Sequence, residues 1–157
     1  MRLEYFELVD RIADLDLAAG TIAAECVLPE RSTVFEGHFP GHPILPGVLM
    51  IEAMAQTGGW LVMARLGFRR MAFLASVKEA KMRRFLAPGQ PLRVEATELH
   101  EGSGYAVASA RILADGRTVA DTEITYRVMD FPNADLRAAM LKAAARVQVP
   151  AELLPDA

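Results

Sequence analysis

The chain has 157 residues, 52% hydrophobic and 24% charged, a composition that predicts one compact domain with a true core and excludes a disordered chain. The formal net charge of −3 gives no general attraction to nucleic acid, so we do not expect a nucleic-acid partner. The single cysteine, Cys26, excludes an intrachain disulfide and a cysteine-rich zinc site.

Two strands are expected first, at residues 8–16 and 21–28, because short runs of mixed apolar and polar residues flank an Ala-Ala-Gly turn signal. The residues before and within the first strand carry acids and no long apolar segment. We therefore expect no secretory signal and a cytoplasmic protein. Residues 29–46 follow as a loop rich in proline and glycine.

A long helix is expected at residues 47–66, since Pro46 suits a first helical turn and Gly67 suits a helix end. Its apolar residues lie nearly all round the helix, which predicts burial on nearly all sides. Glu52, Gln56 and several glycines interrupt the apolar run. A bilayer disfavours such a glutamate, so we expect a buried core helix and no membrane span.

Four strands and a final helix complete the predicted order. Hairpin signals separate the expected strands at residues 71–86, 91–100, 105–114 and 118–129. The helix at residues 133–149 carries one apolar face, expected to dock on the sheet or on a partner subunit. The predicted fold class is α+β, an antiparallel sheet wrapped around one long central helix. Residues 1–130 would form the domain, and residues 131–157 its C-terminal helical extension.

Two kinds of site are disfavoured by the local sequence. His38 and His42 have the spacing of metal ligands on a helix, and Glu36 lies nearby, but the intervening prolines and glycine exclude a helix there. No metal site is therefore expected. Cys26 lies in a predicted strand without a neighbouring histidine, and the chain has no Gly-x-Ser-x-Gly motif, so a cysteine or serine nucleophile is not expected either.

A histidine and a glutamate remain as candidate acid–base residues. Glu52 lies in an apolar helix, where desolvation disfavours a charged carboxylate, and Gln56 one turn later is placed to orient it. The unpaired amides of Gly47 and Val48 at the helix start can polarise a carbonyl oxygen, and His38 can act as base. The alternative is structural: a buried glutamate often pairs with arginine, and a loop histidine often caps a turn. The residues alone leave both interpretations open.

The stretch GHFPGHPILPGVLMIEAMAQ resembles the signature of the FabZ-type (3R)-hydroxyacyl-(acyl carrier protein) dehydratases. The family pattern is Gly-His-Phe-Pro-Gly-x-Pro, then Pro-Gly-Val-Leu, then Glu-Ala-x-Ala-Gln, and His38 precedes Glu52 by 14 positions as in the family. The likeness extends over about residues 4–128. It implies a single hotdog domain and a homodimer at minimum, or a trimer of dimers, in which each site takes its histidine and glutamate from different subunits.

The resemblance also implies roles for these residues. His38 would remove the α-proton of a 3-hydroxyacyl thioester, and Glu52 of the other subunit would protonate the departing hydroxyl. Gly47, with Val48 beside it, would bind the thioester oxygen, and Gln56 would hold Glu52. No cofactor is implied, since acyl carrier protein brings its own phosphopantetheine arm. FabA-type relatives, which also isomerise the double bond, carry aspartate at the helix position, so a glutamate favours plain dehydration.

A basic patch suits the acidic acyl carrier protein as partner, with an ordinary solvated surface as the alternative; its residues are Arg69, Arg70, Lys81, Arg83 and Arg84. Three features depart from the family pattern: the usual first helix and Pro-His-Arg-x-Pro-Phe segment do not precede Tyr5-Phe6, Arg84-Phe85 replaces a common Arg-Pro, and residues 131–157 extend beyond the last predicted strand. From these departures we form the hypothesis that the chain is a paralogue specialised for long acyl groups. The competing functions are a hotdog acyl thioesterase and a non-catalytic acyl-carrier-binding subunit.

Overall fold

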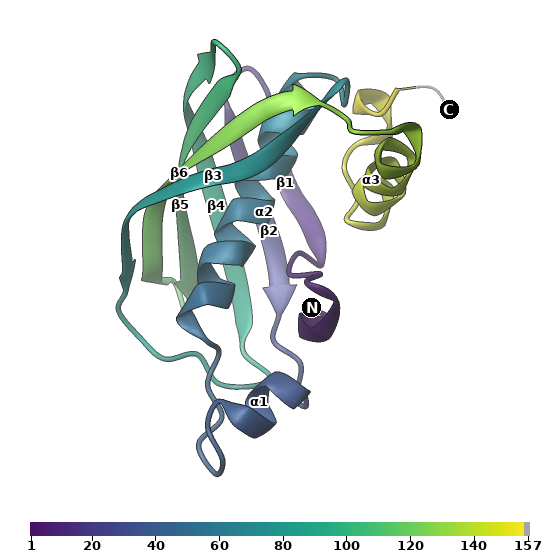
Figure 1. The fold of residues 1–157 in the computed structure, drawn as a ribbon. Helices are drawn as coiled ribbons and strands as arrows, with labels where there is room; N and C mark the ends of the chain where they lie inside the picture. The colour runs from purple at the N-terminus through teal and green to yellow at the C-terminus, as the bar shows by residue number, and fades with distance from the viewer. Residues whose placement is uncertain (156–157) are drawn as a thin grey trace.

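An antiparallel sheet of six strands curls around one long helix in the computed structural model, which describes residues 1–155 (Figure 1). The strand order across the sheet is β1-β2-β4-β5-β6-β3. The strands are β1 (Arg11–Asp16), β2 (Thr21–Val27), β3 (Arg70–Met82), β4 (Pro91–Gly102), β5 (Tyr105–Ala114) and β6 (Arg117–Asp130). The helices are α1 (Thr33–Gly37), α2 (Gly47–Arg65) and α3 (Ala134–Arg146), with 3-10 turns η1 (Leu3–Tyr5) and η2 (Ala151–Leu153). The predicted fold class and element order are confirmed; residues 156–157 of the predicted extension lie outside the described part.

Two tight hairpins set the register of the central strands. Ser103 and Gly104 between β4 and β5, and Asp115 and Gly116 between β5 and β6, all have positive φ angles. Two successive positive φ angles are typical of the type I′ turn, whose twist matches that of the strands. The pairing then places the alternating buried residues of β4 and β5 toward α2. The strands predicted here are confirmed with nearly the same bounds.

The long helix α2 fills the inside of the curled sheet. It ends where expected, because Gly67 takes a φ of 58° and donates its amide to the Ala64 carbonyl at 2.9 Å. Gly58 allows close contact with β6, since a Cβ there would collide with the hydroxyl of Tyr126. By length and composition α2 is able to cross a membrane, but 72% of its apolar stretch is buried inside the fold. Packing in the core therefore accounts for its apolar character.

Three predicted boundaries are corrected by the structure. The loop at residues 29–46 contains α1, whose start is capped by the Ser32 hydroxyl accepting the Val34 amide at 3.1 Å. The first strand is shorter than predicted, because the Leu8 amide bonds to a side chain of α2 instead of β2. The strand predicted to reach residue 86 ends at residue 82, since the Leu86 carbonyl accepts the amide of Leu45, just before α2.

The C-terminal helix α3 packs on its own chain, beside β1 (Figure 1). Asn133 caps it by accepting the Leu136 amide at 2.8 Å. The Arg137 guanidinium donates to the Phe68 carbonyl at 3.2 Å, and the Ile12 amide donates to the Val147 carbonyl at 2.7 Å. These bonds join α3 to the end of α2 and to the start of β1, so the helix is an integral part of the fold.

Candidate active site

His38 follows α1 directly and is held by its own loop. Its amide donates to the Val34 carbonyl at 3.0 Å, and its carbonyl accepts the Ile44 amide at 2.9 Å. The ring nitrogen Nδ1 lies 3.0 Å from the Ile44 carbonyl oxygen. A carbonyl only accepts, so Nδ1 carries the hydrogen and the neutral ring presents Nε2 as a proton acceptor. The loop therefore selects the tautomer that a general base at Nε2 requires.

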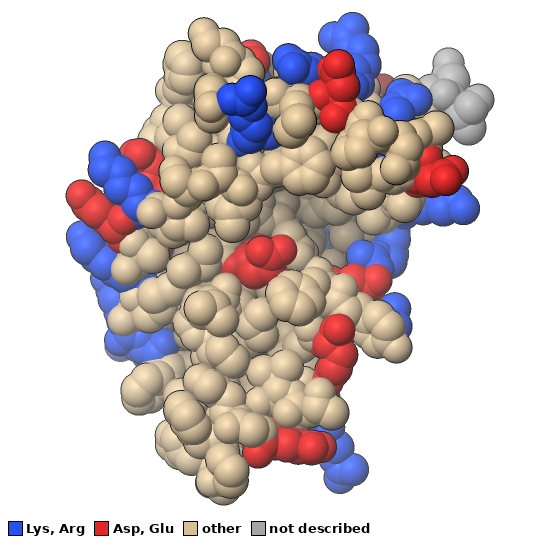
Figure 2. All heavy atoms as spheres, viewed as in Figure 1, with Lys and Arg blue, Asp and Glu red and all other residues tan. Residues whose placement is uncertain are grey.

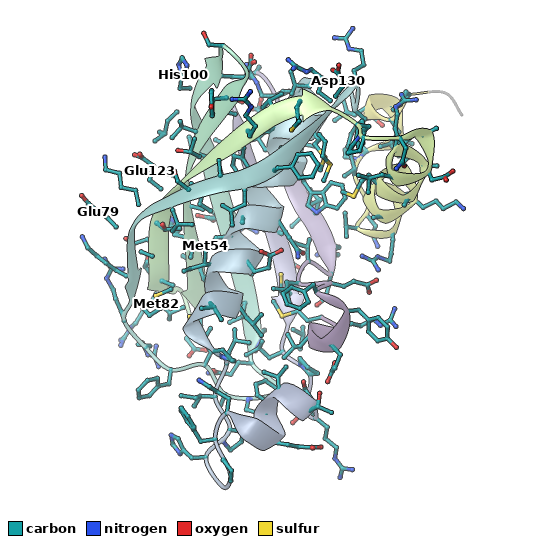
Figure 3. All side chains as sticks on the ribbon, viewed as in Figure 1. Met54, Glu79, Met82, His100, Glu123 and Asp130 are labelled. Atoms are coloured by element: carbon teal, nitrogen blue, oxygen red, sulfur yellow. The ribbon has the colours of Figure 1, made fainter. Side chains whose placement is uncertain are left out.

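The start of α2 lies in the same cavity as His38. The first amides hydrogen-bonded to the Pro46 carbonyl are those of Leu49 and Met50, and within residues 1–155 the amides of Gly47 and Val48 have no recorded backbone partner. Such amides can stabilise negative charge on a carbonyl oxygen. His38 and Gly47 line one cavity of about 420 Å³ with the side chain of Met82, labelled in Figure 3 at the end of β3.

Glu52 is oriented by a glutamine one turn further along α2. The Gln56 Nε2 donates to Glu52 Oε1 at 2.9 Å and to the Phe6 carbonyl at 2.6 Å. The Gln56 Oε1 in turn accepts the Leu8 amide at 3.1 Å. Each end of the amide group is thus fixed by backbone, and within the described residues Glu52 Oε2 has no recorded hydrogen-bond partner. The contacts from Phe6 and Leu8 had no signal in the sequence, because 50 and 48 positions separate them from Gln56.

A second cavity, of about 270 Å³, opens beside Glu52. Gln56 and Tyr126 share its lining, and most of the other lining residues are apolar. Tyr126 is buried and donates its hydroxyl to the Ala55 carbonyl at 2.9 Å. Burial raises the pKa of Tyr126, and the nearby negative charge of Glu52 raises it further, so the phenol stays protonated. Tyr126 therefore supports the helix turn next to the carboxylate as a neutral group.

The structure does not bring His38 and Glu52 into one cavity within the chain. The two cavities share no lining residue. Exposed apolar side chains border both cavities: Phe39 and Phe85, the latter 77% exposed, line the cavity of His38, and Leu74 lines that of Glu52. Val48, next to Gly47 on α2, is 71% exposed. Figure 2 shows that this side of the molecule is largely uncharged and hollowed near its centre. An exposed apolar surface of this kind is typical of a protein–protein contact.

The basic residues predicted as one patch lie at the two ends of β3. Arg69 and Arg70 adjoin its start, and Lys81, Arg83 and Arg84 adjoin its end. Arg70 and Lys81 are eleven positions apart along the strand, roughly 35 Å at full extension. Arg83 and Arg84 line the cavity of His38, and Arg83 forms an ion pair with Asp121. Only this end of β3 can thus act directly at that cavity.

The disfavoured site types gain no support from the geometry. Burial, the largest cause, raises the pKa of the Cys26 thiol to about 12, so a reactive thiolate is not available near neutral pH. Within residues 1–155, no group of three or more histidine, cysteine, aspartate or glutamate side chains is placed to hold a metal ion. The side chain of His42 is exposed, and its backbone amide and carbonyl form hydrogen bonds with the backbone of Phe39.

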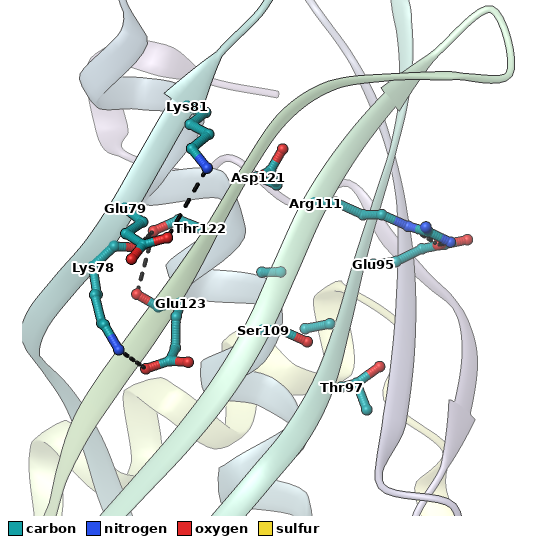
Figure 4. A pocket seen from close by; sticks show the side chains of 12 residues that line it. Lys78, Glu79, Lys81, Glu95, Thr97, Ser109, Arg111, Asp121, Thr122 and Glu123 are labelled. Carbon is teal, nitrogen blue, oxygen red and sulfur yellow. Dashed lines mark hydrogen bonds and ion pairs between the residues drawn. The ribbon is translucent and has the colours of Figure 1, made fainter.

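The face of the sheet turned away from α2 holds a polar hollow that the sequence did not indicate (Figure 4). Its volume is about 510 Å³. Lys78 lies 3.9 Å from Glu123, and Arg111 lies 2.8 Å from Glu95 across the strands. Acids and bases pair within the hollow, so no charge of one sign is left to select a ligand.

An antiparallel sheet curled around one central helix defines the chain as a hotdog-fold protein. Solved structures agree. A conserved protein from Pseudomonas aeruginosa superposes with a TM-score of 0.61 at 21% identity, covering 76% of this chain and 87% of that one. A hypothetical thioesterase from Streptococcus pneumoniae, crystallised with coenzyme A, gives a TM-score of 0.61 at 15% identity over 78% and 88% of the two chains. At these identities the likeness shows the fold alone.

Sequence comparison identifies the family. The FabA-like domain family matches residues 2–123. The 3-hydroxyacyl-(acyl-carrier-protein) dehydratase FabZ of Protochlamydia amoebophila is 38% identical over 125 residues, which are 80% of this chain and 81% of the relative. The FabZ of Acidiphilium cryptum is 40% identical over 130 residues, 80% and 77% of the two chains. The chain belongs to the FabA-like family and is a hydro-lyase of the FabZ type, as the sequence resemblance predicted.

Proposed function

We propose that the protein dehydrates (3R)-3-hydroxyacyl groups on acyl carrier protein reversibly to trans-2-enoyl groups in fatty acid synthesis. The observation that carries this proposal is a base and an acid in two separate cavities, each bordered by exposed apolar side chains. A second subunit that covers these side chains would complete each site. FabZ relatives named for this reaction match over four fifths of the chain.

In the proposed reaction His38 Nε2 takes the α-proton of the substrate. The Gly47 amide, with that of Val48 beside it, donates to the thioester oxygen, which holds the negative charge as the carbon–hydrogen bond breaks. The carbon–oxygen bond at C3 then breaks, and the partner subunit's Glu52, in its protonated form, gives its proton to the departing hydroxyl. Water and the enoyl thioester result, and the proton on His38 returns to Glu52 before the next turnover.

The assembly we propose is a homodimer at minimum, with a trimer of dimers as its larger form. β3 is an edge strand, and its residues from Leu74 to Met82 are exposed. An unpaired edge offers backbone groups to the same strand of a second copy. Pairing there would cover the exposed Leu74 and bring the partner against the surface between the two cavities. Sedimentation analysis distinguishes dimer from hexamer.

The proposed partner is acyl carrier protein, and the proposed location is the cytoplasm. The carrier brings its own phosphopantetheine arm, so the proposed reaction needs no separate cofactor. Arg84 supports this assignment, because it lines the His38 cavity and has no recorded ion pair within residues 1–155. A cation at the cavity mouth attracts an acidic carrier. Arg69, Arg70 and Lys81 lie further along β3 or at its other end and would contribute only to longer-range attraction.

The test is hydration of trans-2-enoyl thioesters by wild type, His38→Ala and Glu52→Gln. Each variant is expected to lose about 10²-fold or more in kcat, as loss of an acid or base does. His42→Ala is the matched control, since that histidine lies in the same loop and is exposed. Unchanged rates in both variants would exclude the proposal. Release of free thiol from a saturated acyl thioester would indicate a thioesterase, and carrier binding without any turnover a non-catalytic subunit.

A further inference from the structure

We propose that α3 forms a wall of the acyl-chain cavity and that its residues Met140 and Ala143 determine which acyl chains are accepted. The inference rests on the proposed function for the identity of the ligand, an acyl chain attached to a thioester. It concerns a part of the chain that lies beyond residues 2–123, the span that matches the FabA-like family. The wall is therefore a feature that the family match does not supply.

The cavity beside Glu52 extends along one face of α2. Glu52, Gln56, Trp60 and Met63 all line it, and they fall on successive turns of the helix. A rise of 1.5 Å per residue makes this distance roughly 16 Å along the helix axis. A thioester held near Glu52 would thus direct its alkyl chain along α2 toward Met63.

Besides Tyr126 and the segment before β1, the other walls of the cavity come from β3 and α3. β3 contributes Met71, Ala72 and Leu74, and α3 with the residue after it contributes Met140, Ala143, Arg146 and Val147. The sequence predicted that Met140, Ala143 and Val147 share one apolar helix face, and the structure directs that face into the cavity. Without α3 the cavity would be open to solvent on that side.

The position of α3 is fixed at both of its ends. Near its start Arg137 donates to the Phe68 carbonyl at 3.2 Å, just after α2. Near its end Arg146 forms an ion pair with Glu7, and the Val147 carbonyl accepts the Ile12 amide. Ala144 and Val147 are buried in the core. A wall attached in this way leaves a fixed volume, and a fixed volume is what length selection requires.

The lining suits an alkyl chain. Apart from Glu52 and Gln56 at one end and the Glu7–Arg146 pair, it consists of apolar side chains, with Tyr126 bonded to the backbone. Three of them are methionines, whose flexible thioethers adapt to chains of different shape. Each methylene that finds room in such a site strengthens binding by about fourfold. Each methylene that meets a wall loses this gain, so the profile against chain length reports the wall directly.

The experiment compares turnover of carrier-bound 3-hydroxyacyl groups of increasing length in wild type, Ala143→Phe and Met140→Ala. Filling the cavity at Ala143 is expected to lower kcat/KM at least tenfold for the longest chains accepted by wild type and less than twofold for the shortest. Emptying it at Met140 is expected to move the optimum to longer chains. Ala139→Phe is the matched control, because it makes the same change on the exposed side of α3.

A binding measurement separates this inference from the proposed reaction. Trp60 is the only tryptophan and lines the cavity, so its fluorescence reports the binding of saturated acyl-pantetheines without any turnover. If no variant or wild type turns over substrate, but Ala143→Phe still weakens the binding of long chains selectively, the reaction is refuted and the wall is confirmed. Length profiles of Ala143→Phe and Met140→Ala that both parallel wild type overturn the wall, as does a lack of binding at every length. If Ala143→Phe fails to fold, Met140→Ala alone decides.

Discussion

The proposed active site has two half-sites, one around His38 and one around Glu52, and the two are held in different ways. Every hydrogen bond that positions His38 comes from residues within six positions of it, at Val34 and Ile44. Glu52 is oriented by Gln56, and Gln56 is itself fixed by backbone groups 50 and 48 positions away, at Phe6 and Leu8. The histidine is thus positioned by a local loop, and the glutamate by the assembled fold.

This difference separates two kinds of dependence. A loop closed by its own backbone bonds keeps its shape as long as its proline and glycine positions are intact. A carboxylate oriented through a distant segment is sensitive to whatever moves that segment, including α3, whose Arg146 pairs with Glu7 between Phe6 and Leu8. Changes far from the reacting atoms are therefore expected to act through Glu52 more than through His38.

The largest expected effect tests whether the two half-sites meet only between subunits. His38→Ala and Glu52→Gln, each about 10²-fold impaired alone, are mixed under conditions that allow subunits to exchange. Random exchange in a twofold dimer makes half of the molecules mixed, each with one intact site of two, so about a quarter of wild-type activity should return. Activity is measured as enoyl thioester hydration before and after exchange.

The control for this experiment is the double variant His38→Ala/Glu52→Gln mixed with wild type. If the pair acts within one chain, one site of the mixed dimer carries both changes and the other carries none. If the pair acts between chains, each site of the mixed dimer carries one change. Action within one chain predicts no recovery when the single variants are mixed. That outcome would refute the two-subunit site while leaving both residues catalytic.

The next effect concerns the support of Glu52. Gln56→Leu removes the bond to Glu52 and leaves the Phe6 carbonyl and the Leu8 amide without their partner. Unsatisfied backbone groups of this kind cost about 1–3 kcal/mol in free energy of unfolding. A misoriented acid should lower kcat by about tenfold, equivalent to one lost hydrogen bond of about 1.4 kcal/mol. Denaturant unfolding and kinetics with a short substrate measure the two effects.

Gln90→Leu provides a matched comparison, because Gln90 Oε1 accepts the Ala87 amide at 2.8 Å in a loop away from both cavities. It should change stability less, since that loop is exposed, and should leave kcat alone. Equal losses of kcat in the two variants would mean that Gln56 acts only by stabilising the fold. Gln56→Glu keeps an acceptor for the Leu8 amide but removes the donor to Glu52 and to the Phe6 carbonyl and places a second carboxylate beside Glu52, so it should restore neither kcat nor full stability.

Much of the local half-site could be predicted from sequence. The proline and glycine positions around His38 and before α2 fix turns and a helix start by their own backbone preferences. The hairpins at Ser103-Gly104 and Asp115-Gly116 were likewise predictable, because few residues accept two successive positive φ angles. Together with strand alternation they determined the fold class and the order of the elements.

The parts that escaped prediction depend on contacts between distant segments. The bonds from Phe6 and Leu8 to Gln56 and the approach of the Tyr126 hydroxyl to α2 leave no periodic or spacing signal. The basic residues read as one patch because they are close in sequence, but an extended strand places its two ends far apart. The role of α3 as a cavity wall likewise required the fold, although its apolar face was visible.

A smaller effect is expected at the mouth of the local half-site. Arg84→Glu should raise KM for carrier-bound substrates by about threefold at low salt and less at high salt, because a charge at the rim acts mainly on encounter. KM for pantetheine-type substrates should not change. Arg69→Glu is the matched control at the other end of β3. Equal effects of the two variants would show that carrier attraction depends on net charge and not on the position of Arg84.

The smallest effect lies at the far end of the network behind Glu52. The hydrogen bond from Arg146, followed by the charges of Arg146 and Arg2, holds the pKa of Glu7 below its ordinary value of 4.5. A carboxyl whose pKa is lower when folded stabilises the protein above its unfolded pKa, and this contribution disappears as the pH falls through the folded pKa. Glu7→Gln should therefore lower the free energy of unfolding by at most about 1 kcal/mol at pH 7, the usual value for an exposed ion pair.

Well below pH 4.5 wild type and Glu7→Gln should unfold at the same denaturant concentration, since Glu7 is then neutral in both states of the wild type. Glu101→Gln is a control on the exposed tip of β4, where Glu101 has no ion pair within residues 1–155. Its unfolding midpoint should therefore differ little from that of wild type at either pH. At pH 7 Glu7→Gln should also reduce kcat slightly while leaving the binding of carrier unchanged, because loosening α3 reaches Glu52 through Phe6 and Leu8. A change in stability without any change in kcat would show that the segment holding Gln56 does not depend on α3. The orientation of Glu52 would then be less sensitive to distant changes than its hydrogen bonds indicate.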